Sequence, residues 1–365
     1  MKNGLDEQYI DLLKDILENG VEKNTRNGKV LSVFGRSIRY KFKDGKFPLL
    51  TTKKMYFKGI VTELLWFLRG DTNIKFLVDN DCHIWDGDAY KNYFNKTKDL
   101  TKDDFEAKGN GVIVIKGFDL KSINQYGNIS GTISNSYFIP YTQEEFINKI
   151  KTDPEFAKTW GELGKIYGRQ WRSWGTGETV TVGHNGQHTL LGEKGIDQIA
   201  NLIHDLKTNP DSRRLMVSAW NVAELDQMTL PPCHFSWQCY SHEKDGKRYL
   251  SLAWNQRSCD VGLGIPFNIA SYGLLLEIIA RSVNMIPYEL IGNLGDCHIY
   301  NNHIDGVKEQ LTREPYPLPI LKINSGNENW HLLEIDEIIN SFDPDLTFKV
   351  ENYQSHPSIK LPLSN

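Results

Sequence analysis

The stretch "YLSLAWNQRSCDVGLGIPFNIASYGLLLEIIARSV" covers residues 249–283 and holds the two patterns that decide the fold. Its first part, 249–258, alternates large apolar side chains with smaller or polar ones, which is typical of a β-strand. Residues 267–283 are apolar nearly all round, and this pattern predicts a buried central helix.

Neighbouring segments also show apolar patterns that are typical of strands and helices. Residues 233–240 predict another strand, and Asp245-Gly246 between the two strands favours a tight hairpin turn. The other clear patterns predict helices at 5–19, 59–70 and 195–210, and strands at 30–42 and 213–220. This order of elements predicts an α+β fold, a large mixed β-sheet packed with helices.

The domain organisation follows from length and from local changes in composition. The length of 365 residues allows one large domain or two ordinary ones, and we expect a single domain over residues 1–365. Residues 87–160 are rich in Lys, Asn, Gly and Ser, and they predict an inserted subdomain on the surface of that domain. Residues 175–195 predict a second, smaller insertion that forms a hairpin.

The overall composition limits the functions that the chain can have. The net charge of −4 argues against binding to polymeric nucleic acid, which requires a basic surface. The five cysteines are an odd number without a CxxC pair, so a disulfide framework and structural zinc are not expected. The sequence contains neither a signal-peptide core nor an apolar run long enough to span a bilayer, and we expect a cytoplasmic protein.

The stretch "LPPCHFSWQ", residues 230–238, places a lone cysteine after two prolines and before a histidine. Prolines fix the backbone, so the segment is a rigid approach rather than a flexible linker. A rigid segment that presents the Cys233 thiol beside the His234 imidazole is suited to aim a nucleophile. The alternative is an ordinary turn into a strand.

Glu63 lies on the same helical stripe as apolar residues in "IVTELLWFL". A carboxylate on an apolar face costs free energy unless it is paired, hydrogen-bonded or protonated. One interpretation is a glutamate at the edge of the stripe that pairs with Lys58 or Arg69. The other is a buried acid–base group with a raised pKa.

Further polar residues allow both a structural and a functional interpretation. The adjacent Arg213 and Arg214 form either a solvated strand end or a phosphate clamp. Asn268, just inside the predicted central helix, either caps the helix or reads the amide edge of a ligand. His298 and Tyr300 lie at strand spacing on one face, and His298 and His303 lack a suitably placed second carboxylate for a metal site. We therefore expect no metal.

Long motifs in a fixed order connect these features. They are "FPLLTTKK", "ELLWFLRGDTN", "IWD", "YGRQWR", "DSRRLMVSAWN", "LPPCHF", "QRSCDVGLGIPFNIASY", "GDCHIYNNH" and "HPSIK". With these motifs the chain resembles thymidylate synthases from Leu5 to near its C-terminus, with the two insertions set aside. The resemblance implies a homodimer that converts dUMP with 5,10-methylenetetrahydrofolate as co-substrate, through a covalent adduct between Cys233 and C6 of the base.

The resemblance also implies a role for individual residues. The implied catalytic set is Cys233, Glu63, Tyr167, Asn268, Asp260 and His234. The implied nucleotide site is Arg26, Arg213, Arg214, Gln256, Arg257, Ser258, Asn268, His298 and Tyr300, with Arg213 and Arg214 supplied by the other subunit. The implied folate site is Ile84, Trp85, Leu230, Asp260, Leu263, Gly264 and Phe267.

Two departures from the family pattern bear on the last reaction step. Position 88 is Asp, where bacterial relatives tend to have a second Trp, and the chain ends in Ser364-Asn365 rather than in a small apolar pair. Transfer of hydride from the folate to the exocyclic methylene intermediate gives dTMP, as in thymidylate synthase. Addition of water gives 5-hydroxymethyl-dUMP, as in the related deoxyuridylate hydroxymethylases. Trp85 favours hydride transfer, because it is expected to shield the intermediate.

Overall fold

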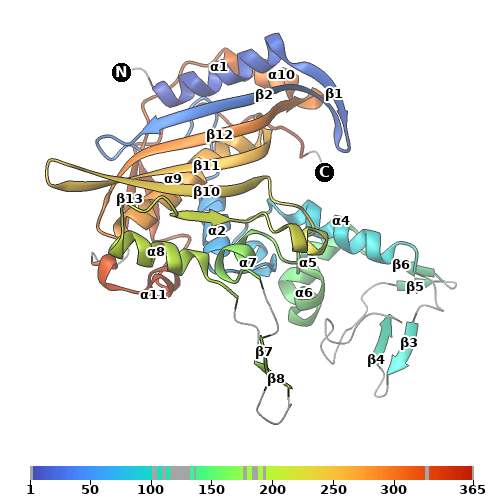
Figure 1. Cartoon of the computed structure of the whole chain (residues 1–365). Helices are drawn as coiled ribbons and strands as arrows, with labels where there is room; N and C mark the ends of the chain where they lie inside the picture. The colour runs from blue at the N-terminus through green and yellow to red at the C-terminus, as the bar shows by residue number, and fades with distance from the viewer. Residues whose placement is uncertain are drawn as a thin grey trace. The chain divides into compact units, whose positions relative to one another are not determined.

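The computed structural model describes residues 3–100, 105–108, 112–115, 132–134, 137–175, 179–182, 188–191, 195–324 and 329–363 (Figure 1). The chain divides into two compact units. The first comprises 1–70, 167–221 and 232–364, and the second comprises 71–166 and 222–231 with Asn365. The predicted insertion at 87–160 falls within the second unit, and the C-terminal Ser364 and Asn365 lie outside the described residues.

A six-stranded sheet forms the centre of the first unit. Its strands, in spatial order, are β1 (Val21–Thr25), β2 (Gly28–Lys41), β12 (Ile286–Tyr300), β11 (Lys247–Asp260), β10 (His234–Lys244) and β9 (Met216–Ser218). Strands β11 and β12 pair in parallel, and the other neighbours pair antiparallel. The sheet is therefore mixed, as predicted.

The turn between β10 and β11 follows from its two residues. Asp245 has φ 51° and Gly246 has φ 69°, so both lie in the left-handed region. Two consecutive positive φ angles give the two-residue turn whose twist matches that of the flanking strands, and Asp-Gly is a favoured pair for it. The predicted hairpin is confirmed.

Helix α9 (Gly264–Ser282) connects the parallel strands β11 and β12 and is buried over most of its length. Parallel neighbours require such a crossover, and this one lies behind the strands in Figure 1. The other helices of the first unit are α1 (Gly4–Asn19), α2 (Phe57–Leu68), α7 (Tyr167–Arg172), α8 (Gln198–Thr208), α10 (Ile304–Leu311) and α11 (Ile335–Asn340). The helices and strands predicted from periodicity are all present. The described helices include none that could cross a membrane.

Two small antiparallel pairs complete the first unit. Strand β13 (Ile320–Ile323) pairs with β14 (Phe348–Glu351), and β7 (Thr179–Val182) pairs with β8 (His188–Leu191). The second of these pairs confirms the hairpin predicted within 175–195.

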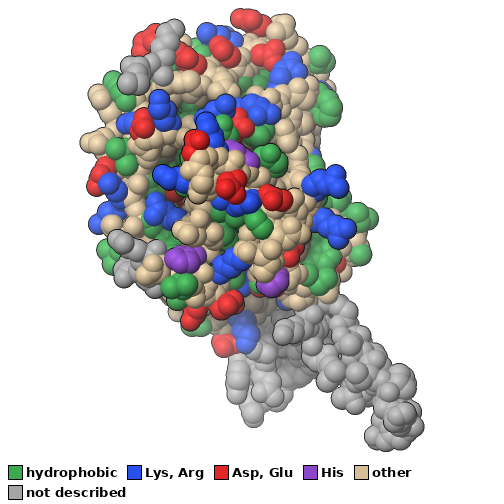
Figure 2. Space-filling view, turned by 60° about the vertical axis from the view of Figure 1, so that its left-hand side comes forward, with side chains coloured by type: hydrophobic (Ala, Val, Ile, Leu, Met, Phe, Trp, Pro, Cys, Tyr) green, Lys and Arg blue, Asp and Glu red, His purple; other side chains and the backbone are tan. Residues whose placement is uncertain are grey.

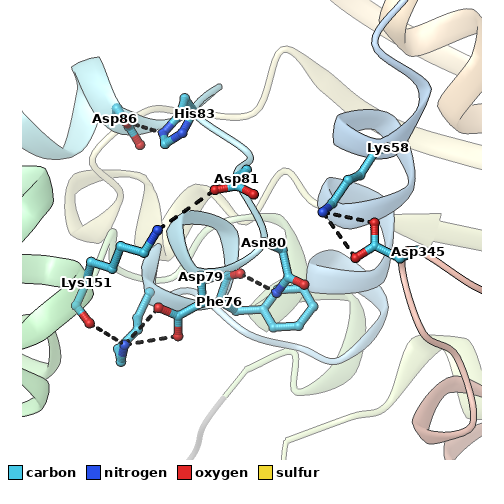
Figure 3. Close-up of polar contacts among 10 residues, drawn as sticks. Lys58, Phe76, Asp79, Asn80, Asp81, His83, Asp86, Lys151 and Asp345 are labelled. Carbon is cyan, nitrogen blue, oxygen red and sulfur yellow. Dashed lines mark hydrogen bonds and ion pairs between the residues drawn. The ribbon is translucent and has the colours of Figure 1, made fainter.

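The second unit contains short helices and two hairpins. They are α3 (Lys75–Asp79), α4 (Asp86–Thr97), α5 (Gln143–Thr152), α6 (Pro154–Trp160), β3 (Phe105–Lys108) with β4 (Val112–Ile115), and β5 (Thr132–Ser134) with β6 (Tyr137–Ile139). Packed aromatic rings join its helices, with centroid distances of 5.0 Å for Tyr93–Phe146 and for Tyr93–Trp160. Figure 3 shows polar contacts on this unit, among them His83 with Asp86, and also the Lys58–Asp345 pair of the first unit.

Surface charge on the face seen in Figure 2 is of both signs. Basic and acidic side chains alternate over it and do not gather into a band of one sign. A protein that tracks a nucleic-acid backbone needs a continuous basic surface, and this face does not provide one.

Candidate active site

Cys233 lies just before strand β10, and its backbone is held on both sides. Its N–H donates to the Tyr167 hydroxyl oxygen at 2.7 Å, and its carbonyl accepts the N–H of Arg257 at 2.8 Å. The residue is half-buried, and its sulfur is a thiol rather than part of a disulfide. A backbone fixed in this way sets the point from which the thiol extends.

Arg257 is exposed, yet two contacts orient it. Its Nε donates to the Pro232 carbonyl at 2.9 Å, and its guanidinium lies 5.2 Å from the centroid of the Trp220 ring. The second contact is a cation–π arrangement. Together they hold a positive charge beside the Cys233 segment, where it can stabilise a thiolate or bind a phosphate.

The His234 imidazole packs into an aromatic cluster. Its ring stacks on Tyr167 with centroids 4.3 Å apart, and its Nδ1 lies 2.8 Å from the Tyr272 hydroxyl oxygen. Burial lowers the pKa of His234 to about 3. The imidazole is therefore neutral at physiological pH and contributes a hydrogen bond rather than a charge.

Glu63, on helix α2, is only 8% exposed, so it does not lie at a solvent edge. Lys58, one of the partners considered from the sequence, pairs with Asp345 at 2.9 Å. Burial, and then the Glu63 carboxylate, raise the pKa of Tyr272 well above its usual value. Burial, and then Cys233, raise the pKa of Tyr167, with a smaller effect from Glu63. The Cys233 thiol and the Glu63 carboxyl group are thus both within electrostatic range of Tyr167, and Glu63 is also within range of Tyr272.

A relay of three buried or half-buried side chains fixes the amide of Asn268. The indole Nε1 of Trp254 donates to Gln256 Oε1 at 3.2 Å, and Gln256 Nε2 donates to Asn268 Oδ1 at 3.1 Å. An indole nitrogen can only donate, so it determines which end of the Gln256 amide faces Trp254. The orientation of Asn268 then follows, with Nδ2 directed away from Gln256.

Asp260 and the start of helix α9 lie next to this amide. The Asp260 Oδ1 accepts the N–H of Leu263 at 3.0 Å. A Cβ at Gly264 would lie 3.7 Å from Asp260 Cβ and 3.9 Å from Asn268 Oδ1. The side chains of Asp260 and Asn268 thus flank Gly264. Ser258 is half-buried nearby, and its carbonyl accepts from Gln256 Nε2 at 3.0 Å.

His298 and Tyr300 lie on one face of β12, as predicted, with their rings 5.3 Å apart at 87°. His298 Nδ1 lies 3.2 Å from the Asp296 carbonyl oxygen. Burial, and then Asp260, raise the pKa of Tyr300, and Cys233 contributes in the same direction. Tyr300 therefore connects this strand electrostatically to both Asp260 and the thiol.

The other arginines of the predicted nucleotide site, Arg26, Arg213 and Arg214, are exposed. Arg26 lies in the turn between β1 and β2, where its Nε donates to Asn27 Oδ1 at 3.2 Å. Arg213 and Arg214 precede the edge strand β9, and within the described ranges no acidic side chain pairs with either. Both guanidinium groups are available to an anion.

The predicted folate residues are divided between the two units. Asp260, Leu263, Gly264 and Phe267 belong to the first unit, and the last three of them lie at the start of α9. Ile84, Trp85 and Leu230 belong to the second, in which Trp85 is 6% exposed and immediately precedes helix α4. No group of three His, Cys, Asp or Glu side chains within the described residues is arranged to hold a metal ion.

A protein-family model matches almost the whole chain. The model described as "Thymidylate synthase" matches residues 7–365. The chain belongs to the thymidylate synthase family. The fold and the enzyme class that the motifs imply are confirmed by this match, and the protein is an enzyme that transfers a one-carbon unit.

Curated relatives match along almost the whole length. The thymidylate synthase of Mesoplasma florum is 40% identical over 353 residues, which cover 96% of this chain and 97% of the relative. That of Malacoplasma penetrans is 41% identical, with 97% and 98% covered. That of Listeria monocytogenes serotype 4a is 41% identical, with 98% and 99% covered.

The geometry adds two residues that the sequence did not indicate. Tyr272 contacts His234, and Trp254 orients Gln256. Tyr272 follows Asn268 by four positions, so it lies on the same face of α9, and this spacing was available from the sequence. Gln256, the partner of Trp254, lies two residues further along strand β11, so both side chains lie on the same face of the sheet.

Proposed function

We propose that the protein is a thymidylate synthase that reductively methylates dUMP to dTMP through a covalent adduct between Cys233 and C6 of the base. The observation that carries this proposal is the fixed Cys233 backbone between Tyr167 and Arg257, in a chain that belongs to this family. Uracil C5 is a poor nucleophile. Addition of the thiolate to C6 places negative charge on O4 and C5, and C5 then attacks the one-carbon unit.

The nucleotide is bound by groups of matching charge and polarity. We assign the phosphate to Arg26, Arg257 and Ser258, and the ribose to His298 and Tyr300. Asn268, oriented by Gln256, accepts from N3–H with Oδ1 and donates to O4 with Nδ2. This pattern fits uracil, and cytosine presents the reverse.

Proton transfer is assigned to buried groups beside the base. Glu63 lies within electrostatic range of Tyr167 and Tyr272, and both phenols stay protonated because burial raises their pKa values. The Tyr167 oxygen accepts from Cys233, which leaves its proton to be donated. His234 is neutral and holds the position of this group through Tyr272.

Methylenetetrahydrofolate supplies the one-carbon unit and the hydride when it is bound. We assign its pterin ring to Asp260, whose carboxylate is fixed by the N–H of Leu263. Gly264 and Phe267 extend this side of the site. Ile84, Trp85 and Leu230 are assigned to the same ligand, and Trp85 to the shielding of the exocyclic methylene.

The active form is proposed to be a homodimer in the cytoplasm. Large apolar side chains are exposed on the strands of the central sheet, with Phe34 at 77%, Tyr240 at 65% and Met216 at 51%. An exposed apolar sheet face favours association with a second copy. Arg213 and Arg214, unpaired within the described chain, are proposed to cross to the phosphate of the partner's site. Five cysteines without a disulfide suit a reducing compartment.

The test is the product of the wild-type enzyme with dUMP and methylenetetrahydrofolate. We expect dTMP by chromatography and dihydrofolate by absorbance. With 5-fluoro-dUMP and the folate, mass spectrometry should find the nucleotide on Cys233 alone, and Cys233→Ser should abolish both adduct and turnover. Formation of 5-hydroxymethyl-dUMP without dihydrofolate, or an adduct on Cys239 or Cys259, would overturn the proposal.

A further inference from the structure

His303 is a fully buried histidine whose position the reaction does not explain. It ends the short helix η3 (Asn301–His303) and is 0% exposed. Its Nε2 lies 2.7 Å from the carbonyl oxygen of Pro362, near the C-terminus. A carbonyl can only accept, so Nε2 carries the proton and donates it to the tail.

The other ring nitrogen faces a proposed ligand-binding residue. His303 Nδ1 is buried, has no hydrogen-bond partner among the described residues and lies 3.8 Å from Asp260 Oδ1. A Cβ at Gly262 would lie 3.0 Å from it. The imidazole therefore fills the space between Asp260 and the tail, with one nitrogen toward each.

The tail is seated on glycines beside this ring. A Cβ at Gly306 would lie 2.7 Å from Leu361 Cδ2 and 2.8 Å from Ile359 Cγ2. Real Cβ contacts are not this short, so an alanine here would require the Leu361 and Ile359 side chains to shift. Gly306 lies inside helix α10, where glycine is unfavourable relative to alanine. The close approach of the tail gives a physical reason for a glycine at this position.

We propose that His303 is a positioning residue that latches the C-terminal tail in place beside Asp260. This inference rests on the proposed function, in which Asp260 holds the pterin. When the tail is seated, the Nε2–H bond to Pro362 fixes the ring, and the ring packs beside Asp260 without a hydrogen bond to its carboxylate, which lies 3.8 Å from Nδ1. Binding at Asp260 and closure of the tail thereby favour each other.

The test compares His303→Leu, which removes the donor, with His303→Gln, whose amide can replace Nε2–H. For His303→Leu we expect the KM for methylenetetrahydrofolate to rise about fivefold to tenfold, the size of one lost hydrogen bond. The complex with 5-fluoro-dUMP and folate should dissociate faster by a similar factor. The Kd for dUMP should stay within about twofold, and His303→Gln should recover much of the loss.

A second variant acts on the latch without touching the histidine. Gly306→Ala should push the Leu361 and Ile359 side chains away from helix α10 and raise the folate KM, although alanine by itself stabilises the helix. In a chain that lacks residues 362–365, His303→Leu should have no further effect, because its acceptor is gone. An unchanged folate KM in both variants, or an undiminished effect of His303→Leu in the shortened chain, would overturn the latch. Absence of dTMP from the wild type would instead overturn the proposed function.

Discussion

The amide relay leads to a prediction about base selectivity. In the proposed complex, Asn268 Oδ1 accepts both from Gln256 Nε2 and from N3–H of uracil. If the Gln256 amide turned over, Asn268 would turn with it and present Nδ2 to N3, which suits cytosine. Trp254 opposes this rotation because its indole nitrogen only donates, and the Ser258 carbonyl, which only accepts, opposes it from the other end of the amide. Trp254→Phe should therefore reduce the preference for dUMP over dCMP.

The magnitude follows from the single hydrogen bond that is lost. The Trp254 Nε1–Gln256 Oε1 distance is 3.2 Å and both residues are buried. A neutral hydrogen bond contributes about 1 kcal/mol net, which corresponds to a selectivity loss of about fivefold. Phenylalanine retains the stacking on Tyr272, whose ring lies 5.3 Å from the indole at 5°. The contribution of residue 254 to packing should therefore change less than its contribution through the hydrogen bond.

Trp237 offers a matched control for this experiment. It pairs directly with Trp254 on the adjacent strand and is also 0% exposed, but its indole nitrogen has no hydrogen-bond partner among the described residues. Trp237→Phe removes similar volume without removing a hydrogen bond. The assay is equilibrium binding of dUMP and dCMP to both variants, with the Kd ratio as the readout. If both substitutions change the ratio equally, the relay does not determine selectivity.

Three further predictions concern base recognition, the dimer and acid stability. Asn268→Asp should shift turnover from dUMP toward dCMP, measured as kcat/KM for each nucleotide, and wild-type selectivity would contradict its role as base reader. An inactive Arg213→Ala variant mixed with inactive Cys233→Ser should regain activity after subunit exchange if the arginines cross the interface, and no recovery would place each site in one chain. Burial lowers the pKa of His234 to about 3, from 6.5 in the unfolded chain. At a pH between these two pKa values, the His234 imidazole is protonated in the unfolded state but neutral in the folded state. The free energy of unfolding should therefore fall as pH falls, by about 1.4 kcal/mol at pH 5.5 from this residue, and His234→Gln should lack that loss in urea unfolding at pH 5.5 and 7.5.

Local patterns were sufficient for the elements of the fold. The period of two in 249–258 and the all-round apolarity of 267–283 predict β11 and α9, because both depend on neighbours in sequence. Asp245-Gly246 predicts its hairpin for the same reason. The parallel pairing of β11 with β12 depends instead on contacts between distant segments, and periodicity alone does not contain it.

The sequence predicts a set of site residues but not their electrostatic arrangement. The motif at Cys233 places an imidazole beside a thiol, yet only the packed structure shows that Tyr167 and Tyr272 enclose the His234 ring. The stripe around Glu63 fits both an edge and a buried position, and tertiary packing decides between them. Burial depends on segments far apart in sequence, so single-residue patterns do not determine pKa values.

Burial favours the neutral forms of Tyr167, Tyr272 and His234. It raises the pKa of both tyrosines and lowers that of His234, so the phenols keep their protons and the imidazole stays uncharged. A charge that develops on the base during addition to C6 is then met by neutral donors in a site of low dielectric, where each hydrogen bond is stronger than in water. Arg257, anchored by Pro232 and Trp220, provides a fixed cation beside the thiol segment. The proposed reaction requires a cation that stabilises the thiolate and binds the phosphate, and neutral groups that transfer protons to and from the base. Different residues of the site meet these two requirements.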